Sequence, residues 1–164
     1  MTRSFDYFRV KSWQEAVAIL DSLGDKAAIL AGGTDLLPAM KLNLRRPEVL
    51  IDLNGIPRSE DLAADLTNNS EVVVLSPLTK LSQLGTNPLI QKRYSALALA
   101  ASKVGSPQLR NMGTLGGNIC LNTRCIYYNQ SEQWRKTRPA CFKMAGNVCH
   151  VQRKGKNCLA EFQA

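Results

Sequence analysis

The chain has 164 residues, of which 45% are hydrophobic, and a formal net charge of +8. This is the size of one ordinary domain or two small lobes with enough apolar material for a core, which excludes intrinsic disorder. The sequence contains no apolar run of the about 18 residues that a membrane span needs, and its first ten residues lack the apolar core of a secretion signal. We therefore expect a cytoplasmic protein with no membrane partner.

Short strands alternating with helices are predicted in the N-terminal part. Residues 5–10 are typical of a strand, and residues 12–24 of a helix with Ser12 as N-cap, Glu15 completing a capping box and Gly24 past its end. One face of that helix would carry Trp13, Ala16, Val17, Leu20 and Leu23. An apolar run then leads through a Gly-Gly turn into a second helical pattern within 26–44, and residues 49–53 form a further buried-strand candidate.

Turn-forming residues between 54 and 71 predict a change of lobe near residue 55. Beyond it we expect a strand at 71–77, a short helix at 78–84 and a helix at 87–105. A glycine-rich stretch, 106–121, ends in a strand-like apolar pair. The fold class indicated is α+β, in two small lobes.

Two glycine-bearing turns are the first features with chemistry. LAGGTDLL (30–37) places Gly32 and Gly33 between an expected strand and an expected helix, where their N–H groups can approach an anion and Thr34 adds a hydroxyl. GTLGGN (113–118) has a similar composition. Neither turn is a Walker loop or a G-x-G-x-x-G fingerprint, and each alone is more typical of an ordinary tight turn than of a binding site. The pair, one in each lobe, is more informative than either.

The segments LAGGTDLLPAMK and LRNMGTLGGNICLNTRC resemble the FAD-binding subunit of the molybdenum hydroxylases, the family of xanthine dehydrogenase and carbon monoxide dehydrogenase. The resemblance extends from residue 5 onward and implies a two-lobed PCMH-type FAD-binding domain whose two turns hold the FAD diphosphate. It implies no catalytic residue in this chain. The FAD-binding residues that it implies are Leu30, Ala31, Gly32, Gly33, Thr34, Asp35, Leu36, Thr114, Leu115, Gly116, Gly117 and Asn118.

Five cysteines without an export signal favour reduced thiols or metal ligands over a disulfide framework. Three of them lie in ACFKMAGNVCHVQRKGKNC (140–158), but the chain has no Cys-x-x-Cys pair, so spacing alone leaves zinc and iron equally open. We expect Cys120, in the apolar pair, to be a buried free cysteine. The single histidine, His150, is more typical of a surface residue or a neighbour of the site than of a ligand.

The positive charge is concentrated in the same segment. Residues 1–118 carry 13 Lys and Arg against 11 Asp and Glu, whereas residues 119–164 carry 8 against 2. Aromatic and basic residues do not alternate there as in a base-stacking surface, so we expect no nucleic-acid partner. A local anion such as four thiolates around a metal centre explains the charge, and a solvated basic loop is the alternative.

Within the family, residues 122–158 look like the cysteine-rich insert of the β subunits of 4-hydroxybenzoyl-CoA reductases, which holds a [4Fe-4S] cluster. This resemblance implies four cluster ligands, with Cys120 as the spare. The implied ligands are Cys125, Cys141, Cys149 and Cys158.

The function implied by the resemblance is that of an FAD- and [4Fe-4S]-carrying electron-transfer subunit of a molybdenum-dependent aromatic acyl-CoA reductase, used in anaerobic aromatic degradation. Its partners would be a molybdopterin-containing large subunit, a [2Fe-2S] small subunit and a ferredoxin-like electron donor. Two alternatives stay open: a flavin subunit of a xanthine-, aldehyde- or carbon monoxide dehydrogenase-like enzyme, or a zinc-stabilised binding module without a redox role.

The resemblance also divides the chain. Residues 1–54 would form the first FAD-binding subdomain, 55–121 an incomplete second one, and 122–164 the iron–sulfur insert. Since family members continue well beyond this insert, we expect a C-terminally truncated member that binds FAD poorly by itself.

Overall fold

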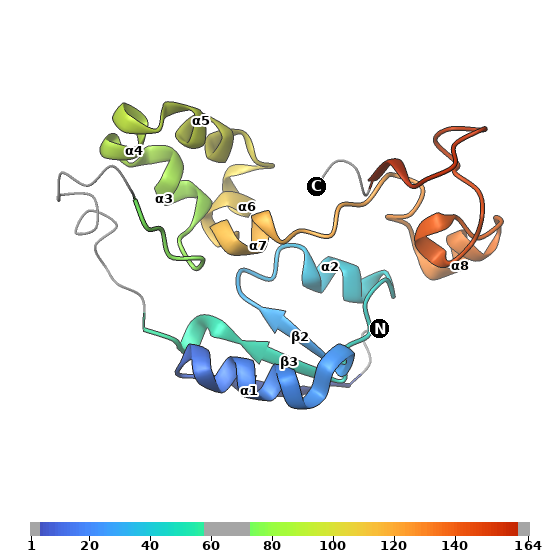
Figure 1. Ribbon diagram of the computed structural model, residues 1–164, viewed down its shortest axis with the longest axis horizontal. Coiled ribbons are helices and arrows are strands. Elements are labelled where there is room, and N and C mark those ends of the chain that lie inside the picture. The colour runs from blue at the N-terminus through green and yellow to red at the C-terminus, as the bar shows by residue number, and fades with distance from the viewer. Residues whose placement is uncertain (1–3, 58–72, 161–164) are drawn as a thin grey trace. The chain divides into compact units, whose positions relative to one another are not determined.

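A computed structural model describes residues 4–57 and 73–160 (Figure 1). The chain forms two compact units. We call Ser4–Thr34 with Pro47–Cys120 the larger unit, and Asp35–Arg46 with Leu121–Ala164 the cysteine unit. Within the described ranges no helix is both long and apolar enough to cross a bilayer. The division into 1–54, 55–121 and 122–164 stays a prediction.

A small parallel sheet forms one part of the larger unit. It contains β1 (Asp6–Arg9), β2 (Ala27–Leu30) and β3 (Val49–Asp52) in the order β1-β3-β2, with Val49 paired to both Asp6 and Ala27. All four residues of the central strand β3 are buried, and Val49 and Ile51 pack in the same cluster as residues of helix α1 (Trp13–Leu23). The predicted strands at 5–10 and 49–53 and the helix at 12–24 are therefore confirmed.

Helix α1 connects the first two strands along the chain and packs on β2 and β3 (Figure 1). The Ser12 hydroxyl caps it by accepting a bond of 3.1 Å from the Glu15 N–H, and Gly24 follows its last residue. The Glu15 carboxylate accepts from the Lys11 N–H at 2.8 Å, which places the return bond of the expected capping box one residue early.

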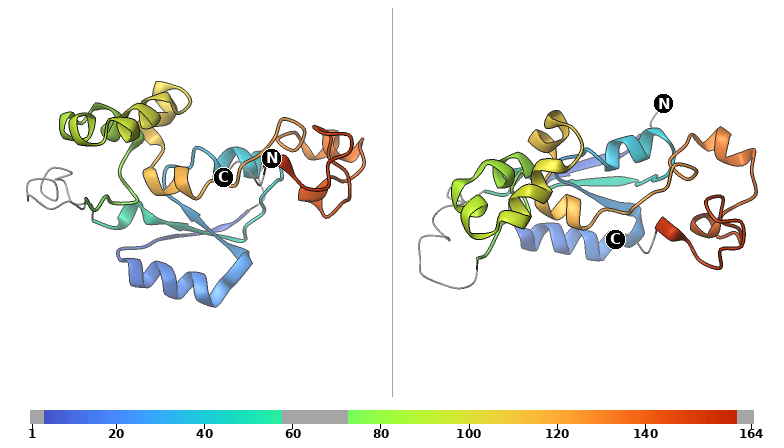
Figure 2. Two further views of the ribbon diagram at one scale, coloured as in Figure 1. Left: turned by 45° about the horizontal axis from the view of Figure 1, so that its top comes forward. Right: turned by 90° about the horizontal axis from the view of Figure 1, so that it is seen from above.

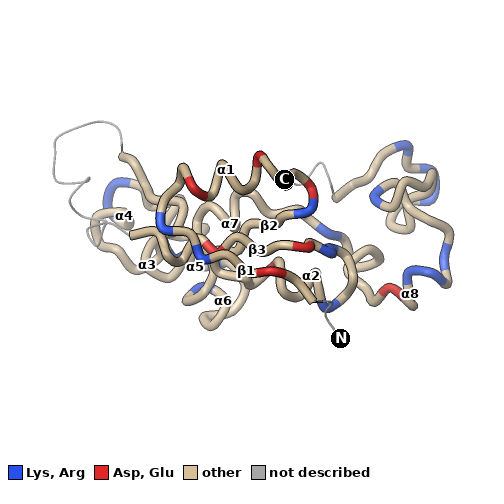
Figure 3. The backbone as a smooth tube through the Cα atoms, turned by 90° about the horizontal axis from the view of Figure 1, so that it is seen from below, with Lys and Arg blue, Asp and Glu red and all other residues tan. Residues whose placement is uncertain are grey.

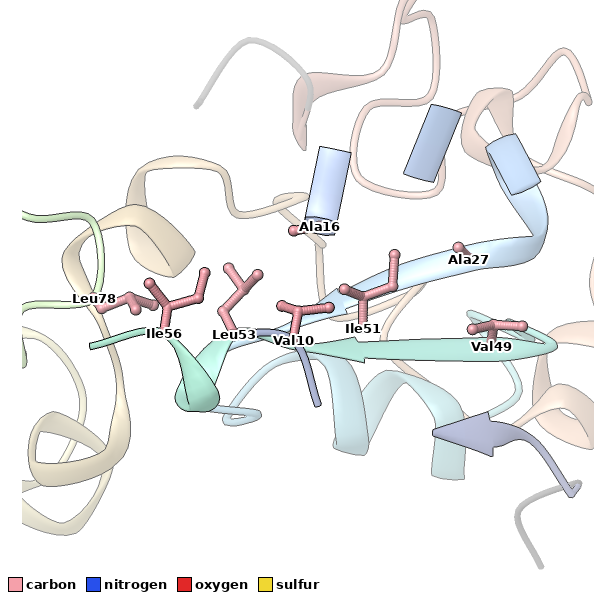
Figure 4. Close-up of a cluster of buried hydrophobic side chains, with 8 residues drawn as sticks. All are labelled: Val10, Ala16, Ala27, Val49, Ile51, Leu53, Ile56 and Leu78. Atoms are coloured by element: carbon pink, nitrogen blue, oxygen red, sulfur yellow. The ribbon is translucent and has the colours of Figure 1, made fainter. Parts of the chain in front are cut away.

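The face that α1 presents to the core differs from the predicted one. Val17 is 64% exposed, because the packed positions follow the i, i+3, i+4, i+7 spacing of one helical stripe, from which residue 17 is excluded. The packed residues are Ala16, Ile19, Leu20 and Leu23. They meet a buried cluster labelled in Figure 4, formed with Val10, Ala27, Val49, Ile51, Leu53, Ile56 and Leu78.

Helices form the remainder of the larger unit. They are α3 (Leu81–Thr86), α4 (Pro88–Arg93), α5 (Ser95–Lys103), α6 (Pro107–Met112) and α7 (Leu115–Ile119). Their own small core is built on Leu81, Leu84 and Ala101, with Ile90 and Ala98 in a neighbouring cluster.

Three predictions for this region are wrong. The single helix at 87–105 is two helices, because Tyr94 has non-helical backbone angles (φ −134°, ψ 53°) between α4 and α5. The end of the stretch 106–121 is not a strand: Thr114 caps α7, Ile119 is the last residue of that helix, and Cys120 follows it as the C-cap. Residues 73–77 of the expected strand 71–77 are not in a strand, and residues 71 and 72, with most of the turn region 54–71, lie outside the described residues.

The cysteine unit has little regular structure (Figure 2). It contains α2 (Leu36–Lys41), α8 (Glu132–Lys136) and a 3-10 turn at Phe142–Met144. Arg135 is only 8% exposed, and its guanidinium donates to the carbonyl oxygens of Leu42 (3.2 Å), Asn43 (3.1 Å) and Gln130. This one side chain therefore ties the loop after α2 to α8. Most other charges of the unit are exposed lysines and arginines (Figure 3).

Candidate functional site

The first glycine turn lies between β2 and α2. A Cβ atom on Gly32 would stand 2.2 Å from the carbonyl oxygen of Met112, so only glycine fits there. Gly33 has a φ of 70°, the left-handed region that glycine adopts at no steric cost. No hydrogen bond within the described ranges uses the N–H group of Gly32, Gly33 or Thr34. The turn therefore presents three consecutive backbone donors that can bind a ligand's oxygen atoms.

The second turn is anchored within the protein. The Gly117 N–H donates to the Thr114 hydroxyl at 3.2 Å, the Gly116 N–H to the Pro77 carbonyl at 2.8 Å, and the Asn118 N–H to the Thr114 carbonyl at 2.9 Å. A Cβ atom on Gly116 would stand 2.7 Å from Pro77 Cβ. These N–H groups already have partners, so the second turn acts as a close-packed wall.

The two turns meet inside the larger unit. Besides the contact of Gly32 with Met112, a Cβ atom on Gly113 would lie 3.6 Å from the Thr34 hydroxyl oxygen. Lys80 donates from Nζ to the same Met112 carbonyl at 2.8 Å, and its backbone pairs with Thr114 in an isolated bridge. Nothing in the sequence indicated Lys80, whose position depends on the fold that brings residues 80 and 112 together.

The end of the central strand supports the first turn. Asn54 Nδ2 donates to the Ala31 carbonyl at 2.8 Å and also to Asp52 Oδ1, while the Asn54 N–H donates to Asp52 Oδ1 at 3.0 Å. The Tyr7 hydroxyl donates to the other carboxylate oxygen of Asp52. Burial alone raises the pKa of Asp52, but the hydrogen bonds from Tyr7 and Asn54 outweigh burial and hold it below the ordinary value of 3.8. Asp52 therefore stays ionised and holds Asn54, which in turn binds the Ala31 carbonyl just before the first turn. The sequence analysis did not identify Asp52 or Asn54, although they lie at and just beyond the end of the predicted strand 49–53.

Four of the five cysteines line one pocket of the cysteine unit. Cys125, Cys141, Cys149 and Cys158 share it with Tyr127, Phe142, Val148, His150, Val151, Leu159 and Ala160. Its walls are mainly apolar, and all four thiols are free and partly buried. The pocket therefore unites the four cysteines that the resemblance implied as ligands.

Local turns set the cysteine backbones. The Cys125 carbonyl accepts from the N–H groups of Tyr128 (3.2 Å) and Asn129 (2.9 Å), and the Cys141 carbonyl accepts from those of Met144 (2.7 Å) and Gly146 (2.9 Å). A Cβ atom on Gly146 would stand 1.7 Å from the Ala140 carbonyl oxygen, so this tight loop requires glycine.

The pocket is not a closed ligand set. In the part of the chain that the structure describes, no three His, Cys, Asp or Glu side chains are arranged as metal ligands. Cys120 is exposed and lies outside the pocket, which corrects its prediction as buried: it caps the C-terminal end of α7 instead of facing a strand. His150 lines the pocket, and its Nε2 lies 3.0 Å from the Pro139 carbonyl.

The comparisons with known proteins agree with this arrangement. The family model described as the FAD-binding domain in molybdopterin dehydrogenase matches residues 3–132. The chain belongs to this family. Together with the sheet and helices of the larger unit, the match confirms an α+β FAD-binding fold.

Carbon monoxide dehydrogenase chains are similar to this chain in sequence and in structure. The carbon monoxide dehydrogenase medium chain of Hydrogenophaga pseudoflava is 44% identical over 115 residues, which are 70% of this chain and 39% of that protein. A solved structure of carbon monoxide dehydrogenase from the same organism aligns with a TM-score of 0.64 and 41% identity, covering 75% of this chain and 42% of that one. The chain spans about two fifths of the length of these relatives.

A third relative matches over a longer stretch. The aldehyde oxidoreductase FAD-binding subunit of Escherichia coli is 31% identical over 147 residues, which are 90% of this chain and 43% of that protein. A match of this coverage leaves out only about a tenth of the chain, so it necessarily extends past Cys141 into the cysteine unit. These comparisons show membership of the family, and they do not show closeness to 4-hydroxybenzoyl-CoA reductase.

Proposed function

We propose that this chain is the FAD-binding part of the flavin subunit of a molybdenum-containing dehydrogenase and that it carries electrons between FAD and partner subunits. The observation that carries the proposal is the meeting of the two glycine turns: Gly32 and Thr34 lie against Met112 and Gly113, and the N–H groups of Gly32, Gly33 and Thr34 are unused. Membership of the FAD-binding family supports FAD as the ligand.

The residues present fit a diphosphate. The N–H groups of the first turn would donate to its oxygen atoms, and Lys80 adds a positive charge next to Met112. The absent side chain of Gly32 lets the two turns approach each other closely. The second turn, from Thr114 to Asn118, would support the other side of the ligand through its packed backbone. FAD, when bound, supplies a carrier that accepts two electrons and passes them on singly.

We propose a [4Fe-4S] cluster as the second cofactor, and the cysteine pocket is the feature that supports this proposal. Its donor set has the right chemistry, four free thiols from Cys125, Cys141, Cys149 and Cys158 around one apolar pocket. Residues 121–160 contain eight Lys and Arg and a single acidic residue, Glu132, so the unit offers positive charge to offset four thiolates. Zinc is the competing metal, because it takes the same four ligands.

The surroundings of the complex follow from the relatives. One relative is named a medium chain and another an FAD-binding subunit, so we propose that a molybdopterin-containing large subunit and a [2Fe-2S] small subunit accompany this chain. Substrates of the carbon monoxide, aldehyde or nicotinate dehydrogenase type are favoured over an aromatic acyl-CoA, since the matched relatives carry those names. A ferredoxin-like protein as the electron donor belongs to the acyl-CoA reductase alternative.

Anaerobic purification tests the proposal. FAD, iron, acid-labile sulfide and zinc are measured on the purified protein, and the visible spectrum is recorded before and after reduction. We expect FAD together with iron and sulfide in equal amounts and a broad visible absorption that bleaches on reduction. Colourless protein with one zinc would refute the redox role. Activity of the assembled complex towards carbon monoxide, aldehydes and nicotinate, compared with aromatic acyl-CoA thioesters, separates the two classes of enzyme.

A further inference from the structure

An ion pair inside the cysteine unit joins the residue after the first glycine turn to the residue before the first pocket cysteine. The Arg124 guanidinium donates from Nη1 to Asp35 Oδ2 at 3.0 Å and from Nη2 to Asp35 Oδ1, so both carboxylate oxygens are used. Eighty-nine positions separate the two residues in sequence. The arginine side chain is only 13% exposed and that of Asp35 35%, so solvent screens this pair less than the surface pair of Lys26 and Glu48, at 66% and 69%.

The third donor of the same guanidinium reaches the cysteine turn. Arg124 Nε donates to Asn129 Oδ1 at 3.1 Å. The Asn129 N–H in turn donates to the Cys125 carbonyl at 2.9 Å, and the Tyr128 N–H joins it at 3.2 Å. Arg124, the residue before Cys125, thus binds the Asn129 end of the turn from Cys125 to Asn129.

The place of Asp35 in sequence makes this pair significant for the ligand. Asp35 directly follows Thr34, whose N–H is one of the three unused donors of the first turn. An unpaired carboxylate beside a diphosphate would repel it and weaken binding, since like charges disfavour one another at short range. The bidentate contact neutralises that charge and turns both carboxylate oxygens towards arginine.

We infer that Arg124 is a positioning residue with two effects: it cancels the charge of Asp35 at the diphosphate turn and it orders the turn that presents Cys125. Asp35 then acts through Arg124 and does not bind the ligand. This inference rests on the proposed function, because the diphosphate belongs to FAD.

The test uses single and double variants of the chain, each purified together with its partner subunits. Arg124→Gln leaves Asp35 unpaired, Asp35→Asn removes its charge, and the double variant removes both charges. Arg46→Gln is the matched control: it removes an arginine of the same unit from its 2.6 Å contact with Glu132, away from the glycine turn and from Cys125. FAD affinity is measured by titration of the deflavinated protein, and amide hydrogen exchange is followed at Tyr128 and Asn129 in the metal-free protein.

We expect Arg124→Gln to raise the Kd for FAD about tenfold, which is ~1.4 kcal/mol, while Asp35→Asn and the double variant stay close to wild type. Exchange at Tyr128 and Asn129 should accelerate in both single variants and not in Arg46→Gln. Arg124→Lys, which keeps the charge but not the fork, should preserve most of the FAD affinity and lose the exchange protection.

Equal FAD affinity in Arg124→Gln and Arg46→Gln would overturn the charge-compensation role, as would a double variant as weak as Arg124→Gln. Unchanged exchange in all variants would overturn the positioning role. Wild-type protein without measurable FAD affinity would contradict the proposed function and the charge-compensation role with it. The exchange measurement would still decide whether Arg124 orders the cysteine turn.

Discussion

Replacing Gly32 by alanine tests the contact between the two glycine turns. The added methyl group would lie 2.2 Å from the Met112 carbonyl oxygen and 2.9 Å from its carbon, both of which are backbone atoms that cannot rotate away. Overpacking of this kind costs about 1–3 kcal/mol, and each kcal/mol lowers the Tm of a chain of this size by about 2–4 °C. We therefore expect Gly32→Ala to lower Tm by roughly 2–12 °C and to raise the Kd for FAD at least tenfold, because the first turn must shift.

Thermal unfolding without FAD and an FAD titration measure the two effects separately. Gly85→Ala is the matched control, because a Cβ there meets Ser102 at 3.4 Å, an ordinary contact, and lies inside helix α3. Alanine in a helix interior is favoured over glycine by about 0.5–1 kcal/mol, so the control should be as stable as wild type or slightly more so. A Gly32→Ala protein with wild-type Tm and wild-type FAD affinity would refute the close approach of the turns.

Three further predictions concern the hydrogen bonds of Asp52, those of Arg135 and the cysteine pocket. The pKa of Asp52 is lower in the folded protein than the ordinary value of 3.8, so the ionised carboxylate stabilises the fold at pH values above 3.8. This contribution is lost as the pH falls below 3.8 towards the folded-state pKa. In urea unfolding at a series of acidic pH values, the free energy of unfolding should therefore fall less steeply for Asp52→Asn than for wild type. Arg135→Gln leaves three carbonyl groups without their charged donor and should reduce the free energy of unfolding by about 2 kcal/mol, measured by urea denaturation; a change within error would contradict the bracing role. Cys149→Ser should lose most of the iron found in anaerobically purified wild-type protein while Cys120→Ser keeps it, and equal iron in both variants would remove Cys149 from the ligand set.

The local elements could be predicted from the sequence where short-range chemistry decides them. Ser12 and Gly24 bound α1 as expected, because a cap depends on neighbouring residues only. The failures depend on the fold. Tyr94 interrupts a continuous helical pattern, and the stretch that ends at Cys120 becomes a helix because Thr114 is held against residues 77–80.

The candidate site divides in the same way. The glycine turns could be found because tight turns and close approaches restrict residue type, and the four cysteines could be proposed as a set from the resemblance. Asn54, Lys80 and the pairing of Arg124 with Asp35 could not be found, because each acts on a group brought close only by tertiary structure. Polar residues at such positions look like ordinary surface residues in a sequence.

The hydrogen bond from Asn54 to Ala31 joins the first glycine turn to the residues that follow the central strand β3. Loosening of the turn would then favour fraying of β3, and FAD bound to the turn would stabilise the sheet as well. At a free FAD concentration one hundred times the Kd, this linkage adds about 2.7 kcal/mol to the free energy of unfolding. Flavin supply would therefore set the lifetime of the polypeptide: a cell short of FAD would hold a chain that opens more often to proteases, and degradation would match the amount of the subunit to its cofactor.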